Sequence, residues 1–298
     1  MKPLHCRRMA ALALLVLGTA QAADLGDILK GLVPDKKSAQ APAAPAGQAA
    51  PAAKPEDQLL QALLSGKTSV EEETRIGRQI AGNLLGAAPL VRDDSLQRYV
   101  NRVGRWVSLQ SERPDLAWRF GVIDSEDINA FAAPGGFIFL TKGLYRRLHN
   151  EAELAGVLGH EIGHVLRKHH LKLLRKSQGI AALGGLLGGK MKDENQLLQN
   201  LIGNGAEIVA RGLDKDAEYE ADRIDVVLSA RAGYDPYALP TVLADIGHVA
   251  KGDQRVSLLF KTHPQPEDRL GELAESVGNK LDGLPPGQNG DKRFYRLR

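Results

Sequence analysis

The stretch from 150 to 166 constrains the fold of this chain most, because it is apolar on nearly every side yet carries His160, Glu161 and His164. Asn150 stands directly before acidic residues, a capping arrangement that predicts the start of an α-helix. A helix with so little polar surface belongs in a hydrophobic core. Burying two imidazoles and a carboxylate there is costly unless they are paired or bound to a metal ion. The sequence therefore predicts a buried central helix that holds a metal site.

The pentapeptide His-Glu-Ile-Gly-His at 160–164 has the spacing of a hydrolytic zinc site. On an α-helix, residues four apart are separated by about 40° of rotation, so both imidazoles leave the same face and can reach one cation. Glu161 is the next residue around the helix, where a carboxylate can take the proton of an attacking water. The alternative is a chance occurrence on an ordinary helix, which the apolar setting disfavours. We predict His160 and His164 as ligands of one Zn²⁺ and Glu161 as the general base.

A third protein ligand is needed, because two imidazoles and a water leave tetrahedral zinc one ligand short. The segment from Glu218 to Asp222 is the candidate, within a helix predicted from about 214 to 232 and ended by Gly233. Glu218 and Asp222 share one face of that helix, whereas Glu220 points away from both. We predict that Glu218 binds the metal and that Asp222 accepts the free N–H of a liganding histidine. The alternative is a solvated acidic face, which would be preferred if the pentapeptide were absent.

The amino terminus has the pattern of a secretory signal peptide over residues 1–22, with basic residues, an apolar run from Met9 to Leu17 and a small-residue cleavage site. The apolar run is too short to span a bilayer, so a cleaved and exported product is expected. Cys6, the only cysteine, precedes this run, which argues against a lipoprotein. The mature chain would then hold no disulfide and no thiolate ligand. These features predict a periplasmic protein.

Charge and composition argue against a nucleic-acid partner. Removing residues 1–22 takes three positive charges from the formal net charge of +3, which leaves about zero. The aromatic content is 5%, and the sequence shows neither a basic stripe nor a stacking platform. The electrostatic attraction that such a partner requires is therefore missing.

The rest of the chain divides by composition into three parts. Residues 23–55 are rich in Ala and Pro, which predicts a flexible linker. Residues 56–278 supply enough apolar sequence for one catalytic domain with a single core. Residues 279–298 are rich in Gly, Pro and Arg, which predicts a flexible tail, although the aromatic segment at 294–297 could dock on the domain. Within the domain, the glycine-rich apolar stretch at 179–189 could form a flap, a surface that contacts lipid or a plain helical connection, but it is too short to cross a membrane.

Helical spacing over 68–85 and 95–110 is followed by strand patterns over 118–123 and 137–141 and then by the metal-binding helix. This order predicts an α+β fold, mainly helical, in which a small sheet packs on the central metal-binding helix. An extended peptide could add to an edge strand through backbone hydrogen bonds that ignore side-chain identity, which would favour unfolded chains. We expect this substrate strand to consist of Phe137, Ile138, Phe139, Leu140 and Thr141.

Several segments together resemble peptidase family M48, the gluzincin metallopeptidases that include HtpX and the CAAX prenyl proteases. The resemblance covers about 71–269. It is carried by the pentapeptide, Glu218 with Ala221-Asp222, Tyr99-Val100-Asn101-Arg102-Val103-Gly104, Asn129-Ala130-Phe131-Ala132, the Pro-Gly-Gly turn and Thr262-His263-Pro264. It implies a zincin-like domain with His160, His164 and Glu218 as zinc ligands and Glu161 as catalytic base. The chain lacks the transmembrane helices of the named members, so it looks most like the soluble periplasmic branch.

In the family that the chain resembles, the loop with Thr262-His263-Pro264 lies over the active site, where the histidine can approach the metal. His263 is therefore a catalytic candidate. It could donate a hydrogen bond to the oxyanion of the tetrahedral intermediate, or it could occupy the water's coordination position and hold the enzyme latent. The alternative is a helix-start signal ahead of Pro266. We assign no metal to the remaining candidates, which are His149, His169, His170 and His248.

Three functions fit this sequence. The first is a periplasmic endopeptidase that hydrolyses unfolded or damaged envelope proteins, a quality-control role motivated by the signal peptide and the ligand set. The second is a chaperone-like or assembly factor for outer-membrane proteins with little proteolysis. The third, a cell-wall or lipid hydrolase, is disfavoured because an edge strand suits peptides.

Overall fold

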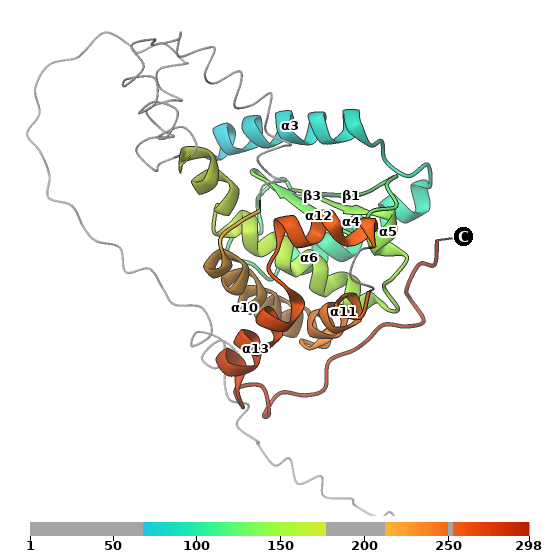
Figure 1. The fold of residues 1–298 in the computed structure, drawn as a ribbon, viewed down its shortest axis with the longest axis vertical. Coiled ribbons are helices and arrows are strands. Elements are labelled where there is room, and N and C mark those ends of the chain that lie inside the picture. The colour runs from blue at the N-terminus through green and yellow to red at the C-terminus, as the bar shows by residue number, and fades with distance from the viewer. Residues whose placement is uncertain (1–67, 177–211, 250–252, 298) are drawn as a thin grey trace, which may run out of the picture.

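The computed structural model describes residues 68–176, 212–249 and 253–297. The predicted signal peptide at 1–22, the predicted linker at 23–55 and the apolar stretch at 179–189 lie outside these residues. Within them, helices predominate and three strands form one sheet (Figure 1). The predicted α+β class is confirmed.

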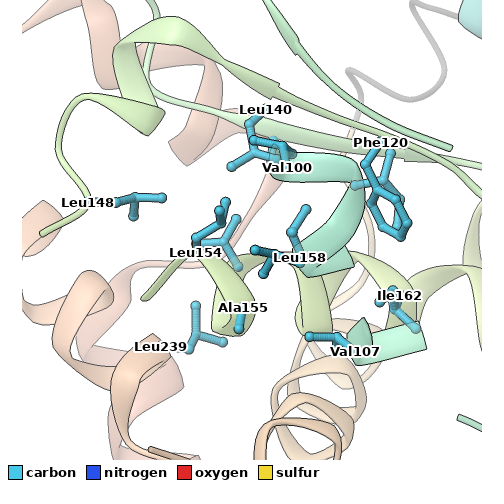
Figure 2. Close-up of a cluster of buried hydrophobic side chains, with 14 of the residues drawn as sticks. Val100, Val107, Phe120, Leu140, Leu148, Leu154, Ala155, Leu158, Ile162 and Leu239 are labelled. Atoms are coloured by element: carbon cyan, nitrogen blue, oxygen red, sulfur yellow. The ribbon is translucent and has the colours of Figure 1, made fainter. Parts of the chain in front are cut away.

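Helix α6, Glu151–Leu166, runs through the centre of the domain, and each of its residues is buried. It begins after Asn150, whose side chain accepts a hydrogen bond from the backbone N–H of Glu153. Its apolar side chains meet those of α4, Asp94–Ser108, and of the sheet. Figure 2 shows this core, which includes Leu154, Leu158 and Ile162 from α6, Val100 and Val107 from α4, and Phe120 and Leu140 from the sheet.

The sheet has the strand order β1-β3-β2, with β1 at Arg119–Ile123, β2 at Ala130–Ala133 and β3 at Phe137–Thr141. β3 pairs in parallel with β1 and antiparallel with β2, so it is the central strand and both of its backbone edges are occupied. The prediction that β3 is the edge that binds substrate is therefore wrong. β3 lies between β1 and β2 because it pairs with both of them. The residue pattern of a single strand does not reveal which strands pair with it.

Alternating side chains of β3 divide the sheet into two faces. Ile138 and Leu140 join the core around α6 and α4. Phe137 and Phe139 join a second cluster with α3, Val70–Ala87. The sheet therefore lies between α3 and the central helix (Figure 1), which confirms the predicted packing of a small sheet on that helix.

Helix α10, Lys215–Ala232, packs closely against α6 because two glycines of α6 face it. A Cβ at Gly159 would stand 2.3 Å from Oδ1 of Asp225, and one at Gly163 would stand 3.1 Å from the backbone of α10. Larger side chains at these two positions would hold the helices apart. The short interhelical distance lets Glu218 of α10 reach the imidazoles of α6.

Further helices are α5 at Lys142–Tyr145, α11 at Ala238–Gly247, α12 at Gln254–Thr262 and α13 at Pro266–Val277. α11 packs on α6, and α13 packs on both α10 and α11. None of the helices in the described ranges is both long enough and apolar enough to cross a bilayer.

The carboxyl-terminal segment, predicted as a flexible tail over 279–298, instead packs on the domain in its described part. Phe294 is buried against the rings of Tyr99 and Tyr145. Arg293 Nε donates a hydrogen bond of 2.9 Å to the buried carboxylate of Glu151. The tail prediction is corrected because these partners lie on distant helices, which the composition of the tail does not reveal.

Candidate metal centre

Four side chains, three from helices α6 and α10 and one from the residue after helix α12, converge on one site. His160 and His164 leave one face of α6, Glu218 leaves α10, and His263 follows the last residue of α12. One donor atom from each lies within 4.8 Å of the others. The Nε2 atoms of the two α6 histidines are 2.9 Å apart, and each is 3.5 Å from an oxygen of Glu218. The structure thus brings together the three predicted ligands and also His263, whose Nε2 is 3.8 Å from Glu218 Oε2. We call these four residues the donor cluster.

The electrostatics of the donor cluster favour a bound cation. Glu218 is fully buried, and within the described residues neither of its carboxylate oxygens has a hydrogen-bond partner. Such a carboxylate is costly unless a positive charge compensates it. Burial and the charge of Arg269 lower the pKa of His160, but Asp222 and Glu218 outweigh them and raise that pKa to about 9. The site therefore attracts positive charge, and its imidazole and carboxylate donors suit a divalent transition metal.

Glu161, the predicted general base, lies beside the donor cluster. It borders a small cavity whose walls include His263 and three residues of β2, Ala130, Phe131 and Ala132. Burial raises the pKa of Glu161 to about 7, against an opposing effect of His160. A carboxylate with a pKa near neutrality can both accept a proton and return it.

Asp222 lies behind His160, one turn along α10 from Glu218. Its Oδ1 is 2.8 Å from His160 Nδ1, the ring nitrogen that faces away from the donor cluster. Arg269 of α13 donates to Asp222 Oδ2 through Nε at 2.9 Å and also contacts Oδ1. Burial raises the pKa of Asp222, but the guanidinium outweighs burial and holds it well below its usual range. The sequence pattern does not reveal this role of Arg269, because Arg269 lies 47 residues from Asp222 on another helix.

His164 has a different partner, His169, to which the sequence motifs assign no role. His169 is buried, its Nδ1 is 2.9 Å from His164 Nδ1, and its Nε2 is 3.1 Å from Glu220 Oε2. The hydrogen bond from His169 lowers the pKa of Glu220 to about 2. His169 escaped assignment because it follows α6 rather than lying within it. Of the other unassigned histidines, His170 is buried and borders the same small cavity as Glu161.

The family model of peptidase family M48 matches residues 92–277, which span α4 to α13 and contain the whole donor cluster. The chain belongs to peptidase family M48. The resemblance drawn from the sequence motifs is confirmed. Membership places the chain in a family of metallopeptidases, which agrees with a buried group of donors suited to a metal ion.

Named relatives include proteases from bacteria and a plant. The chain is 30% identical over 237 residues to the beta-barrel assembly-enhancing protease of Yersinia pestis, and this match covers 77% of this chain and 49% of that protein. It is 31% identical over 222 residues to the protein of the same name from Escherichia coli strain K12, and this match covers 72% of this chain and 45% of that protein. It is 28% identical over 185 residues to the mitochondrial metalloendopeptidase OMA1 of Arabidopsis thaliana, with 62% and 36% covered. The chain thus spans about half the length of the bacterial relatives and less of the plant protein.

Proposed function

We propose that this chain is a zinc-dependent endopeptidase that hydrolyses internal peptide bonds of unfolded or damaged envelope proteins in the bacterial periplasm. The observation that carries the proposal is the convergence of two imidazoles on a buried carboxylate whose oxygens have no hydrogen-bond partner among the described residues. Family membership supports peptide hydrolysis, and the signal-like pattern at 1–22 supports export.

In this proposal, His160 and His164 would hold Zn²⁺ through their Nε2 atoms, and Glu218 would hold it through a carboxylate oxygen. A bound zinc would act as a Lewis acid that polarises the scissile carbonyl and lowers the pKa of water. Glu161 accepts the proton of the attacking water and returns it to the leaving amine. Asp222 keeps a proton on His160 Nδ1, so that the Nε2 lone pair remains available to the metal.

We assign substrate binding to β2 rather than to β3. β2 is an edge strand of the sheet, and its residues Ala130, Phe131 and Ala132 border the cavity that also holds Glu161. A peptide that pairs with β2 would bring its backbone beside this carboxylate. Because backbone pairing ignores side-chain identity, the enzyme should cleave many sequences but prefer chains that are already extended.

We assign an inhibitory role to His263. Burial lowers its pKa to about 4, so its ring is neutral and offers a lone pair, and its Nε2 lies within the donor cluster. A fourth protein ligand would fill the coordination position that the attacking water needs. His263→Ala should therefore increase cleavage of an unfolded substrate, whereas a role in binding the oxyanion would make the same variant slower.

The central test is Glu161→Gln, with cleavage of an unfolded test protein and zinc content measured on the same preparation. Cleavage should be lost while zinc stays near one ion per chain, because the amide cannot accept the proton and Glu161 is not a proposed ligand. Glu275→Gln on the exposed surface of α13 is the matched control and should cleave normally. Retained cleavage by Glu161→Gln would refute the proposal.

The names of the bacterial relatives motivate a second candidate, an assembly factor for outer-membrane proteins with little proteolysis. The same variant separates the two. A Glu161→Gln protein that still corrects an envelope defect in a strain lacking the natural protein would favour assembly, and failure to correct it would favour hydrolysis.

A further inference from the structure

His164 is held from behind by residues that have no role in the proposed function. Its Nδ1 lies 2.9 Å from Nδ1 of His169, and the other ring nitrogen of His169 lies 3.1 Å from Glu220 Oε2. Glu220 Oε1 in turn accepts a hydrogen bond of 2.9 Å from Nε of Arg167. The four side chains form one polar chain that runs outward, from His164 at 1% exposure to Glu220 at 26%.

Hydrogen-bond chemistry allows one arrangement of protons along this chain if His164 offers Nε2 to a cation. A neutral imidazole carries one N–H and one lone pair. If the lone pair is on His164 Nε2, the proton is on Nδ1 and is donated to His169 Nδ1. The proton of His169 is then on Nε2, which faces the carboxylate acceptor of Glu220. Every contact in the chain is satisfied by this arrangement.

A turn after α6 places His169 where it can act. The helix ends at Leu166, Lys168 has a φ of 55°, and helical residues resume at 169. The side chain of Lys168 pairs with the buried carboxylate of Glu73, which ties this left-handed residue to α3. On an uninterrupted helix, residue 169 would lie about 140° around the axis from His164. With the turn, the two rings lie 5.2 Å apart between centroids.

We infer that His169 and Glu220 are positioning residues that orient His164 for metal binding and hold its proton on Nδ1. The inference rests on the proposed metal centre. Glu220 fixes the ring of His164 through the intervening imidazole of His169, whereas Asp222 contacts the ring of His160 directly. Hydrogen-bond partners of this kind set the orientation and basicity of a liganding histidine. His169 is not itself a ligand in this arrangement, because both of its ring nitrogens are engaged.

The test is zinc affinity, measured by competition with a chromogenic chelator. His169→Phe keeps a ring but removes both nitrogens, and it should weaken zinc binding roughly 10- to 100-fold. His169→Asn retains an acceptor and a donor on a shorter side chain and should recover part of the loss. Glu220→Gln keeps the size of the side chain but weakens the acceptor, so a smaller loss is expected. Glu112→Gln is the matched control, because Glu112 is exposed and pairs with Arg167 at the outer end of these four side chains rather than with either histidine.

A second readout distinguishes positioning from a structural role. In zinc-loaded protein, long-range ¹H–¹⁵N correlations should show the His164 proton on Nδ1 and shielded from exchange, and that shielding should be lost in His169→Phe. Unchanged zinc affinity and unchanged exchange in both His169→Phe and Glu220→Gln would overturn the inference. If His169→Phe does not fold when metal-free, Glu220→Gln alone decides, because its side chain is partly exposed. A wild-type protein that binds no zinc would overturn the proposed function together with this inference, whereas normal wild-type binding with unaffected variants would overturn the inference alone.

Discussion

The two imidazoles of the donor cluster are oriented in different environments. Behind His160, Asp222 and Arg269 are 1% and 4% exposed and meet inside the core. Behind His164, a second imidazole intervenes before Glu220, which borders a cavity of about 430 Å³ and is 26% exposed. A carboxylate pairs with a guanidinium on both sides of the site. The inner pair, Asp222 and Arg269, lies in the core, and the outer pair, Glu220 and Arg167, is partly exposed to solvent. Removal of one partner should therefore destabilise the protein far more at the inner pair than at the outer pair, because solvent screens the outer charges and a buried charge that loses its partner is costly.

The largest effect should follow from Asp222→Ala. Removing this carboxylate leaves the buried guanidinium of Arg269 without a compensating charge. Breaking a buried ion pair in this way lowers the unfolding free energy by about 3–5 kcal/mol. Urea unfolding of metal-free protein measures this loss directly. The matched variant is Glu220→Ala, which should lose no more than about 1 kcal/mol because Glu220 itself and its partner Arg167 are partly solvated. Equal losses in the two variants would contradict the difference between the inner and outer pairs.

A smaller contrast is expected when the guanidinium is changed instead of the carboxylate. Arg269 contacts both oxygens of Asp222, and a lysine cannot reproduce this two-point contact. Arg269→Lys should therefore cost about 1.5–3 kcal/mol of unfolding free energy, in the range of a lost hydrogen bond to a charged group. Arg167 reaches Glu220 through one nitrogen, so Arg167→Lys should change the unfolding free energy by less than about 1 kcal/mol. A larger loss from Arg167→Lys would show that the outer chain is stronger than its exposure suggests.

The same two sides show what the sequence predicts and what it does not. Spacing within one helix was sufficient to identify the face shared by His160 and His164, and the start of α6 at Asn150 follows from local capping. Asp222 was found because it lies one helical turn from Glu218. Local periodicity therefore accounts for most of the inner side of the site.

Features that join separate segments were missed or wrong. Arg269 reaches Asp222 from a different helix, and His169 reaches His164 only because a left-handed residue, Lys168, redirects the chain. The prediction that β3 is the edge strand that binds an extended peptide is wrong, because its position in the sheet is set by pairing with two other strands. Each of these depends on tertiary contacts that a pattern along one segment does not encode.

The spacing of α6 and α10 offers a further contrast between the two sides. Gly159 lies beside Asp225, on the side of His160, and a Cβ there would stand 2.3 Å from a buried carboxylate oxygen. Gly163 is less crowded, with 3.1 Å to the nearest atom of α10. Gly159→Ala should destabilise the metal-free protein by about 1–3 kcal/mol through overpacking. It should also weaken zinc binding, because Glu218 moves away from the imidazoles.

The cause can be checked with a double variant. Asp225→Ala removes the atom that the new methyl group would meet, so it should restore part of the stability and zinc affinity lost in Gly159→Ala. Gly163→Ala is the comparison on the side of His164 and should cost less than Gly159→Ala. A double variant no better than the single one would indicate that the backbone of α10, rather than Asp225, sets the spacing.

The smallest effect concerns the pH dependence of two carboxylates on α10. Asp222 has its pKa lowered, whereas burial raises the pKa of Asp225 well above its usual value. Asp225 Oδ1 accepts a hydrogen bond from Ser229, and Oδ2 has no hydrogen-bond partner within the described residues. The folded protein therefore holds the proton on Asp225 more tightly than the unfolded chain, which releases it above a pH of about 3.9. Stability contributed by Asp225 is present below that pH and is lost as pH rises, the opposite of Asp222, whose contribution is lost as pH falls.

Asp225→Asn isolates the pH-dependent contribution of Asp225 to stability, because the amide has nearly the shape of the neutral acid and cannot ionise. At pH 4 the unfolding free energies of the variant and the wild type should differ by less than about 1 kcal/mol, as expected for a change that conserves volume. As pH rises above about 4, the variant should become progressively more stable than the wild type until Asp225 ionises in the folded wild type, because only the wild type must hold a proton against rising pH. Urea unfolding of metal-free protein across this range gives the comparison. A difference that stays constant with pH would mean that Asp225 is ionised in the folded protein, and the two carboxylates of α10 would then be alike.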